Sequence, residues 1–192
     1  LPGSRMGELK AHTDTLLETA QNLLEVHPDA KFLIPATNDK NVHFIKGRIR
    51  NNPTKNLKLI KGKVDEILSS SNIAIAASGT ASLQIALHKK PMIIIYKGSW
   101  ISYFIWKMVR LIPNVSLPNI LLNENFVPEM LQHRATPNLL SEKACKIIND
   151  NSPNGLGFCE KCTPLNIIMR GKDKNLWKIE KSGKTKKWIK VN

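Results

Sequence analysis

The first 150 residues alternate between two hydrophobic periods, one typical of helices and one typical of buried strands. Leucines recur on one face of residues 8–26, and this spacing predicts a long helix with a single buried stripe. Short, continuous apolar runs predict strands at residues 31–36, 57–60, 72–76 and 91–96. Weaker helical patterns fall between these strands, at residues 40–50, 64–69 and 80–89.

This alternation predicts an α/β fold, a Rossmann-like parallel sheet flanked by helices on both faces. Residues 1–5 are expected to be the end of a further strand, followed by a glycine turn. In such sheets, ligands bind beyond the carboxyl ends of the strands, where the chain turns into helices. Two turns of this kind carry polar residues and are candidate ligand contacts, at residues 3–5 and 78–80.

The second half of the chain contains an unusually aromatic segment, residues 99–112, which predicts a helix. It has two interpretations. It is either a buried core helix or an interfacial helix that places Trp and Phe side chains beside Lys107 and Arg110 on a membrane surface. Beyond it the pattern predicts a loop, a short helix and an amphipathic helix, at residues 115–119, 128–132 and 138–150.

The net charge of +14 is concentrated toward the end of the chain, since residues 151–192 hold ten Lys or Arg and three Asp or Glu. A basic surface suits an anionic partner, a membrane face or nucleic acid, and a lysine-rich composition bias would explain the charge equally well. Residues 151–155 are typical of a linker. We therefore expect a ligand-binding lobe at residues 1–150 and a basic, divergent tail at 151–192, poorly structured or partly packed.

The rest of the composition does not indicate a membrane-spanning protein or a metal-binding protein. No apolar run reaches the roughly 20 residues of a membrane span. The chain starts without Met, and we expect it to be the interior of a longer protein or a truncated gene product. A structural zinc site needs about four ligands, so Cys159 and Cys162 are expected to be free thiols. No histidine has an acidic partner that the sequence identifies, and His12 is expected in solvent.

The turn after the third predicted strand has the chemistry of an anion site. Ser78 and Gly79 are small and let the backbone approach a ligand closely. A helix that begins near Thr80 directs free N–H groups, that of Ala81 among them, toward the ligand, and a phosphate is the anion expected there. The alternative is an ordinary capped helix, because Ser and Thr are favoured caps. Gln84, one turn further, could reach a sugar hydroxyl of a nucleotide.

Gly3, Ser4 and Arg5 form the other candidate contact. A guanidinium at the end of a strand can clamp a diphosphate with two hydrogen bonds, and the alternative is a surface arginine at the edge of a sheet. Asn119 follows a proline, and its amide could bond a base or sugar, or simply close a turn. Paired carboxylates, a Ser-His-Asp order and a Walker motif are all absent from the sequence, so we expect no catalytic residue in this chain.

Five segments, taken together and in this order, resemble the lipid-A-disaccharide synthase family. They are residues 1–5 (LPGSR), 77–81 (ASGTA), 91–96 (PMIIIY), 115–120 (VSLPNI) and 127–132 (VPEMLQ). The resemblance covers about residues 1–150. It implies one lobe of a two-lobed glycosyltransferase-B fold, the C-terminal lobe that holds the UDP-sugar, with the N-terminal lobe missing from this chain.

Enzymes of that family transfer 2,3-diacylglucosamine from its UDP conjugate to 2,3-diacylglucosamine 1-phosphate, with inversion and without a metal or other cofactor. The resemblance therefore implies an inverting hexosyltransferase of lipid A biosynthesis. Its expected place is the cytoplasmic face of the inner membrane of a Gram-negative-type bacterium, in peripheral contact with anionic lipid. Nucleic acid is not an expected partner. The general base and much of the acceptor site belong to the other lobe, so this chain alone is expected to turn over little or nothing.

By motif, the resemblance implies that Arg5 faces the donor diphosphate, that residues 78–80 line the phosphates and that Asn119 belongs to the nucleotide site. Gln84 departs from the family, which has Glu there as a ribose ligand. The tail also departs, because the closing helices of the family are not recognisable in it. Two other interpretations stay open: another glycosyltransferase-B enzyme acting on UDP-sugars, and an inactive fragment with a basic surface for lipid or nucleic acid.

Overall fold

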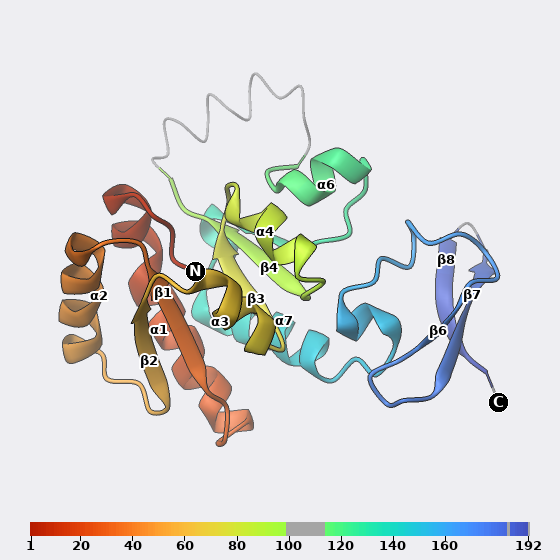
Figure 1. The fold of residues 1–192 in the computed structure, drawn as a ribbon, viewed down its shortest axis with the longest axis horizontal. Coiled ribbons are helices and arrows are strands. Elements are labelled where there is room, and N and C mark those ends of the chain that lie inside the picture. Colours follow the sequence, from red (N-terminus) through yellow and green to blue (C-terminus); the bar gives the residue numbers. More distant parts are fainter. Residues whose placement is uncertain (99–113, 184, 192) are drawn as a thin grey trace.

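A computed structural model describes residues 1–98, 114–183 and 185–191 (Figure 1). The aromatic helix predicted over residues 99–112 lies outside these residues. Among the helices of the described residues, none is both long enough and apolar enough to cross a membrane.

The elements up to residue 98 alternate between helices and strands. In order they are α1 (Met6–Val26), β1 (Phe32–Ala36), α2 (Asp39–Asn51), β2 (Leu57–Lys61), α3 (Val64–Ser70), β3 (Ala74–Ala77), α4 (Ala81–Leu87) and β4 (Met92–Tyr96). The predicted strands and helices of this half are confirmed to within two or three residues at each end. Helix α2 has its predicted start fixed by Asn38, whose side chain accepts a hydrogen bond from the Asn41 N–H at 2.9 Å.

After residue 113 the elements are shorter. They are α6 (Leu117–Leu122), β5 (Glu129–Leu131), η1 (Gln132–Arg134), α7 (Pro137–Ile148), η2 (Pro153–Leu156), β6 (Ile168–Arg170), β7 (Leu176–Ser182) and β8 (Thr185–Lys190). The amphipathic helix predicted over 138–150 is confirmed as α7, which begins after Thr136. The Thr136 hydroxyl caps its first turn.

The strands of the lobe pair in parallel, in two groups. Strand β1 pairs with β2, and β3, β4 and β5 follow one another in a second group. Helices cover both faces of the second group (Figure 1). On one face Ile93 and Ile95 pack against α1 and α7, and on the other Met92 and Ile94 pack against α3 and α4. The doubly wound, Rossmann-like architecture predicted from the sequence is therefore confirmed.

Two predicted elements between residues 114 and 132 are wrong. The expected loop at 115–119 contains the start of α6, in which Pro118 occupies one of the first two helical positions. The expected helix at 128–132 is instead strand β5, followed by the single turn η1. Strand β5 has only three residues, too few to show a period, and its conformation comes from parallel pairing with the edge of β4.

The tail contains a small antiparallel sheet in the order β6-β7-β8. Ile179 and Trp188 face each other across β7 and β8 and are buried. This sheet was not predicted from the sequence. The expectation of free thiols is wrong, because Cys159 and Cys162 form a disulfide. The turn between them brings their Cα atoms to 5.2 Å, within the range that a disulfide spans.

Candidate functional site

Both candidate turns lie at the same edge of the sheet, because Leu1 pairs with β3. The Leu1 amine donates to the Ile75 carbonyl at 2.8 Å, and the Ala77 N–H donates to the Leu1 carbonyl at 2.9 Å. This is the hydrogen-bond pattern of a parallel ladder with Leu1 opposite Ala76. The turn at residues 3–5 and the turn at 78–80 therefore follow the carboxyl ends of two neighbouring stretches of the sheet.

The first turn is built on a left-handed glycine and one carboxylate. Gly3 has φ +115°, and a Cβ there would overlap the Glu8 side chain. Glu8 accepts hydrogen bonds from the backbone N–H of Ser4 at 2.9 Å and of Arg5 at 3.2 Å, which caps helix α1. The Arg5 guanidinium meets Glu8 only at 3.4 Å, and its side chain is 86% exposed. Arg5 is thus anchored through its backbone while its charge is open to a ligand.

The second turn leaves part of its polar surface open. The Ser78 hydroxyl donates to the Val115 carbonyl at 2.8 Å, so it holds the start of the α6 segment in place. Gly79, at φ +153°, and Thr80 are exposed, and α4 begins directly afterwards at Ala81. The open groups are therefore the backbone around Gly79 and the Thr80 hydroxyl, which are the kind of donors that suit an anion.

Gln84 is hydrogen-bonded to an acidic neighbour that sequence spacing did not identify. Its Nε2 donates to Asp65 Oδ1 at 2.8 Å, and His88 Nε2 lies 2.9 Å from the same oxygen. These hydrogen bonds, that of His88 first, lower the pKa of Asp65 below its ordinary value. The expectation that no histidine has an acidic partner is therefore wrong for His88, whose partner comes from α3, 23 residues earlier.

His12 is also placed differently from the prediction, because its ring is fully buried rather than in solvent. Its Nε2 accepts a hydrogen bond from the Lys97 N–H at 2.9 Å, and its Nδ1 lies 3.1 Å from the Pro2 carbonyl oxygen. Burial lowers its pKa. The ring therefore connects the turn after Leu1 to the end of β4. The only sequence signal for this role is its position on the apolar stripe of α1, between Leu9 and Leu16.

The Asn119 side chain is buried rather than open to a ligand. It is 1% exposed, its Oδ1 accepts from the N–H groups of Phe126 and Val127, and its Nδ2 donates to the Val127 carbonyl and to Glu129. These bonds use the hydrogen-bonding capacity of the amide, so they favour a structural role. Its direct contact with a nucleotide stays a prediction.

Glu129, which the sequence analysis did not single out, also belongs to this network. Its carboxylate accepts from the N–H groups of Val115 and Ser116, each at 3.0 Å, from the Ser116 hydroxyl at 2.7 Å and from Asn119 at 2.9 Å. Because Ser78 bonds to Val115 as well, this carboxylate fixes the segment that borders the second turn.

The arrangement is suited to binding rather than to proton transfer. It offers an exposed guanidinium, backbone donors and a hydroxyl at one sheet edge, the groups that recognise phosphate. Among the residues that the structure describes, no group of three or more His, Cys, Asp or Glu is placed to hold a metal ion.

The doubly wound sheet and the two glycine turns at its carboxyl edge define a Rossmann-like, ligand-binding lobe, which is consistent with one lobe of a glycosyltransferase-B fold. Comparison with known proteins gives the family: the model of lipid-A-disaccharide synthetase matches residues 1–155. The chain belongs to this family.

Individual relatives agree with this assignment. The lipid-A-disaccharide synthase of Anaeromyxobacter dehalogenans (strain 2CP-C) is 34% identical over 152 residues, which are 79% of this chain and 40% of the relative. That of Dechloromonas aromatica is 37% identical over 174 residues, 88% of this chain and 45% of the relative. That of Aromatoleum aromaticum is 39% identical over 153 residues, 78% and 39% of the two chains. The chain thus spans about two fifths of the length of the curated relatives it matches.

Proposed function

We propose that this chain is the donor-binding lobe of a lipid-A-disaccharide synthase. In that role it holds the UDP part of UDP-2,3-diacylglucosamine while the sugar is transferred to 2,3-diacylglucosamine 1-phosphate. The observation that carries the proposal is the pairing of Leu1 with β3, which sets the two glycine turns side by side at the carboxyl edge. The family membership supports the choice of a UDP-sugar over other phosphate ligands.

Each candidate residue has a task in this proposal. The Arg5 guanidinium pairs with the diphosphate, and the backbone at Gly79 and the Thr80 hydroxyl donate to its oxygens. Gln84 contacts the ribose once its hydrogen bond to Asp65 is broken. Catalysis depends on holding donor and acceptor together, so we expect the chain alone to bind UDP weakly and to turn over little or nothing, with no metal required.

Calorimetric titration with UDP tests the proposal. We expect millimolar affinity for the unsubstituted chain and a loss of roughly tenfold or more in Arg5→Ala, because a charge-assisted bond to phosphate is worth about 1.5–3 kcal/mol. The matched control is Arg50→Ala, an exposed arginine in the last turn of α2. Equal affinity in both variants, or no heat at millimolar UDP with the chain folded by circular dichroism, would contradict the proposal.

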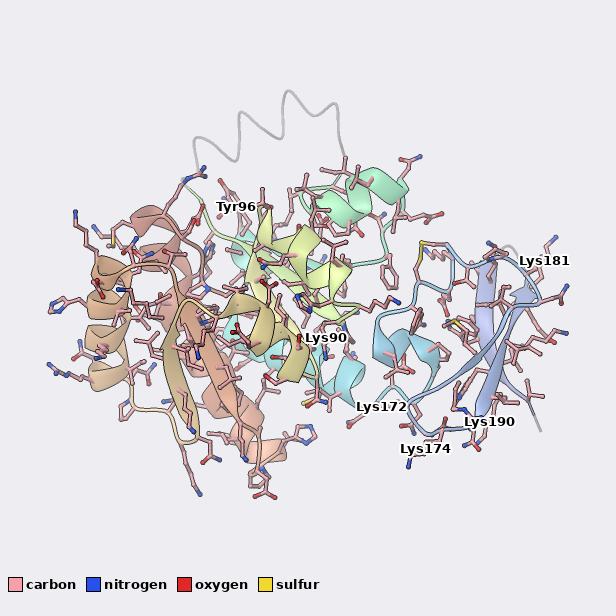
Figure 2. All side chains as sticks on the ribbon, in the orientation of Figure 1. Lys90, Tyr96, Lys172, Lys174, Lys181 and Lys190 are labelled. Carbon is pink, nitrogen blue, oxygen red and sulfur yellow. A yellow bond between two sulfur atoms is a disulfide. The ribbon has the colours of Figure 1, made fainter. Side chains whose placement is uncertain are left out.

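We also propose that the tail sheet makes the peripheral contact with anionic lipid. Figure 2 shows Lys172, Lys174, Lys181 and Lys190 on this part of the molecule. On one face of the sheet, Lys178 lies opposite Ile168 on one side and Ile189 on the other, and both isoleucines are about half exposed. Basic and apolar side chains in one row suit a lipid headgroup surface.

Vesicle flotation tests the lipid contact separately from UDP binding. We expect binding to vesicles rich in anionic lipid, weakened several-fold by the pair Ile168→Ser and Ile189→Ser, with Ile167→Ser as an exposed control outside the sheet. Binding that is unaffected by the pair, or equal on neutral vesicles, would contradict this contact.

A further inference from the structure

The disulfide between Cys159 and Cys162 closes a very short loop, because the two residues are separated by only 3 positions in the sequence. A disulfide stabilises a fold mainly by restricting the unfolded chain, and this effect increases with the length of the loop that is closed. A link across a single turn is therefore at the low end of that scale. The pair is also accessible, since Cys162 is exposed and Cys159 is half-buried. A short, accessible disulfide in a Cys-x-x-Cys arrangement is typical of redox chemistry rather than of a structural link.

Hydrogen bonds that do not depend on the disulfide hold the turn between the two cysteines. The Thr163 N–H donates to the Cys159 carbonyl at 3.0 Å, and the Thr163 hydroxyl donates to the same oxygen at 2.6 Å. From strand β8, the Lys186 ammonium group donates to the carbonyls of Lys161 and Thr163, each at 2.9 Å. These bonds keep the two sulfur atoms near each other when the S–S bond is broken, so the bond can form again from the same turn.

The backbone N–H of Cys162 is placed to stabilise a thiolate at Cys159. It donates to Cys159 Sγ at 3.0 Å, and a hydrogen bond to an ionised acceptor is roughly twice as strong as one to a neutral acceptor. Cys159 is therefore the better leaving group when the disulfide opens. The exposed sulfur of Cys162 is the one that an incoming thiol can reach.

The charges at this turn act in the same direction. Lys161 lies within the turn and Lys186 is bonded to it, and positive charge near a cysteine favours the thiolate. The turn also contains one acidic residue, Glu160, whose carboxylate accepts a hydrogen bond from Asn154 Nδ2 in η2 at 3.0 Å. Two lysines thus outnumber one carboxylate that already has a partner, and the net charge of the turn is positive.

We propose that Cys159 and Cys162 form a redox site, a disulfide that exchanges with small thiols such as glutathione. A glutathione thiolate attacks Cys162 Sγ and forms a mixed disulfide there, while the S–S bond breaks and its electron pair leaves on Cys159 as a thiolate. A second glutathione thiolate attacks the glutathione sulfur of the mixed disulfide, which releases glutathione disulfide and leaves Cys162 as a thiolate. The protein gains two electrons, which the two glutathione molecules lose, and the reverse sequence restores the link. The proposal is independent of UDP binding.

Mass spectrometry of the full chain tests this proposal. The chain is incubated without oxygen in millimolar reduced glutathione, quenched in acid and alkylated in denaturant. We expect Cys159 and Cys162 to become thiols and added glutathione disulfide to restore the link, while Cys145, a free thiol on α7, shows that alkylation is complete. Structural disulfides resist the glutathione pool. A pair that opens only in excess dithiothreitol, or that glutathione disulfide does not reoxidise, overturns the proposal.

A rapid quench of the same reaction identifies the attacked sulfur. Trypsin cleaves after Lys161 and therefore places the two cysteines in different peptides. We expect the glutathione adduct on Cys162, and an adduct mainly on Cys159 overturns the proposed step.

A matched pair of lysine variants tests the contribution of the turn. We expect Lys186→Gln, which removes the ammonium group bonded to the turn, to slow the opening by glutathione about threefold or more. The control is Lys187→Gln, an exposed lysine on the opposite face of β8, which should leave the rate unchanged. Equal rates in the two variants would overturn the stabilisation of the Cys159 thiolate by its surroundings.

Discussion

The backbone N–H of Lys97 donates to Nε2 of His12 at 2.9 Å, across 85 residues of sequence. An N–H can only donate, so Nε2 has a free lone pair and the ring proton is on Nδ1. Nδ1 therefore donates to the Pro2 carbonyl oxygen at 3.1 Å. One neutral imidazole thus connects the turn that begins the lobe to the end of β4, and a proton on Nε2 would oppose the Lys97 N–H.

We predict that His12→Ala destabilises the lobe by about 2–4 kcal/mol, because it leaves the Pro2 carbonyl and the Lys97 N–H without their partner and opens a cavity. Urea unfolding at pH 7.5 measures this. The control is His43→Ala, an exposed histidine on α2, for which we expect a change within about 0.5 kcal/mol. Equal effects in the two variants would show that the bridge contributes nothing.

A second prediction concerns pH and the buried Leu1 amine, whose pKa is lowered from 8.0 to about 5 by desolvation. Between these two pH values the unfolded chain binds a proton at this amine that the folded chain does not. The free energy of unfolding that this group contributes is therefore greatest above pH 8 and decreases as the pH is lowered toward 5. The loss approaches about 4 kcal/mol at pH 5 and then levels off. His12, with its pKa also lowered by burial, adds a loss in the same direction below its ordinary value of 6.5.

N-terminal acetylation separates these two groups. Urea unfolding between pH 8 and pH 5 should give an acetylated chain whose stability is level down to about pH 6.5, because of these two groups His12 alone can still bind a proton. Identical pH profiles for the free and acetylated chains would contradict the assignment to the Leu1 amine.

The sequence predicted those parts of the fold that depend on local patterns. The stripe of leucines in α1 and the apolar runs of β1 and β4 fix element type within short windows. It failed where long-range contacts decide: β5 is a strand because β4 offers it an edge, and His88 meets Asp65 because α3 and α4 lie side by side. Likewise, motif positions indicated Asn119, whereas only the packed structure reveals the bonds that occupy its amide.

We therefore predict that the main effect of Asn119→Ala is a lower free energy of unfolding. Losing four hydrogen bonds in a buried position should cost about 2–4 kcal/mol in urea unfolding, and Glu129→Gln should cost about 1–3 kcal/mol, since it replaces a carboxylate that accepts from three residues. Asn125→Ala, an exposed residue of the same segment, is the control. If Asn119→Ala instead kept its stability and lost UDP affinity, the nucleotide contact implied by the family resemblance would be the correct role.

The last prediction concerns Gln84, a position at which the family resemblance implies a glutamate. A glutamate there would place a second carboxylate beside Asp65, whose oxygen now accepts from the Gln84 amide at 2.8 Å. We expect Gln84→Glu to lower the midpoint of thermal unfolding by about 1–3 °C at pH 7, and the effect to vanish near pH 3 as the introduced glutamate becomes protonated. Asp65→Asn in the same chain removes the repulsion and should restore the midpoint.

The double variant also tests the site. If a carboxylate at position 84 binds the ribose, as the resemblance implies, the chain with both Gln84→Glu and Asp65→Asn should bind UDP up to roughly tenfold more tightly than the unsubstituted chain in calorimetry. Asp65→Asn alone is the matched control, because it makes the same change at position 65 without a carboxylate at position 84. Equal affinity of the double variant and this control would place the ribose away from position 84 and limit the site to the two glycine turns.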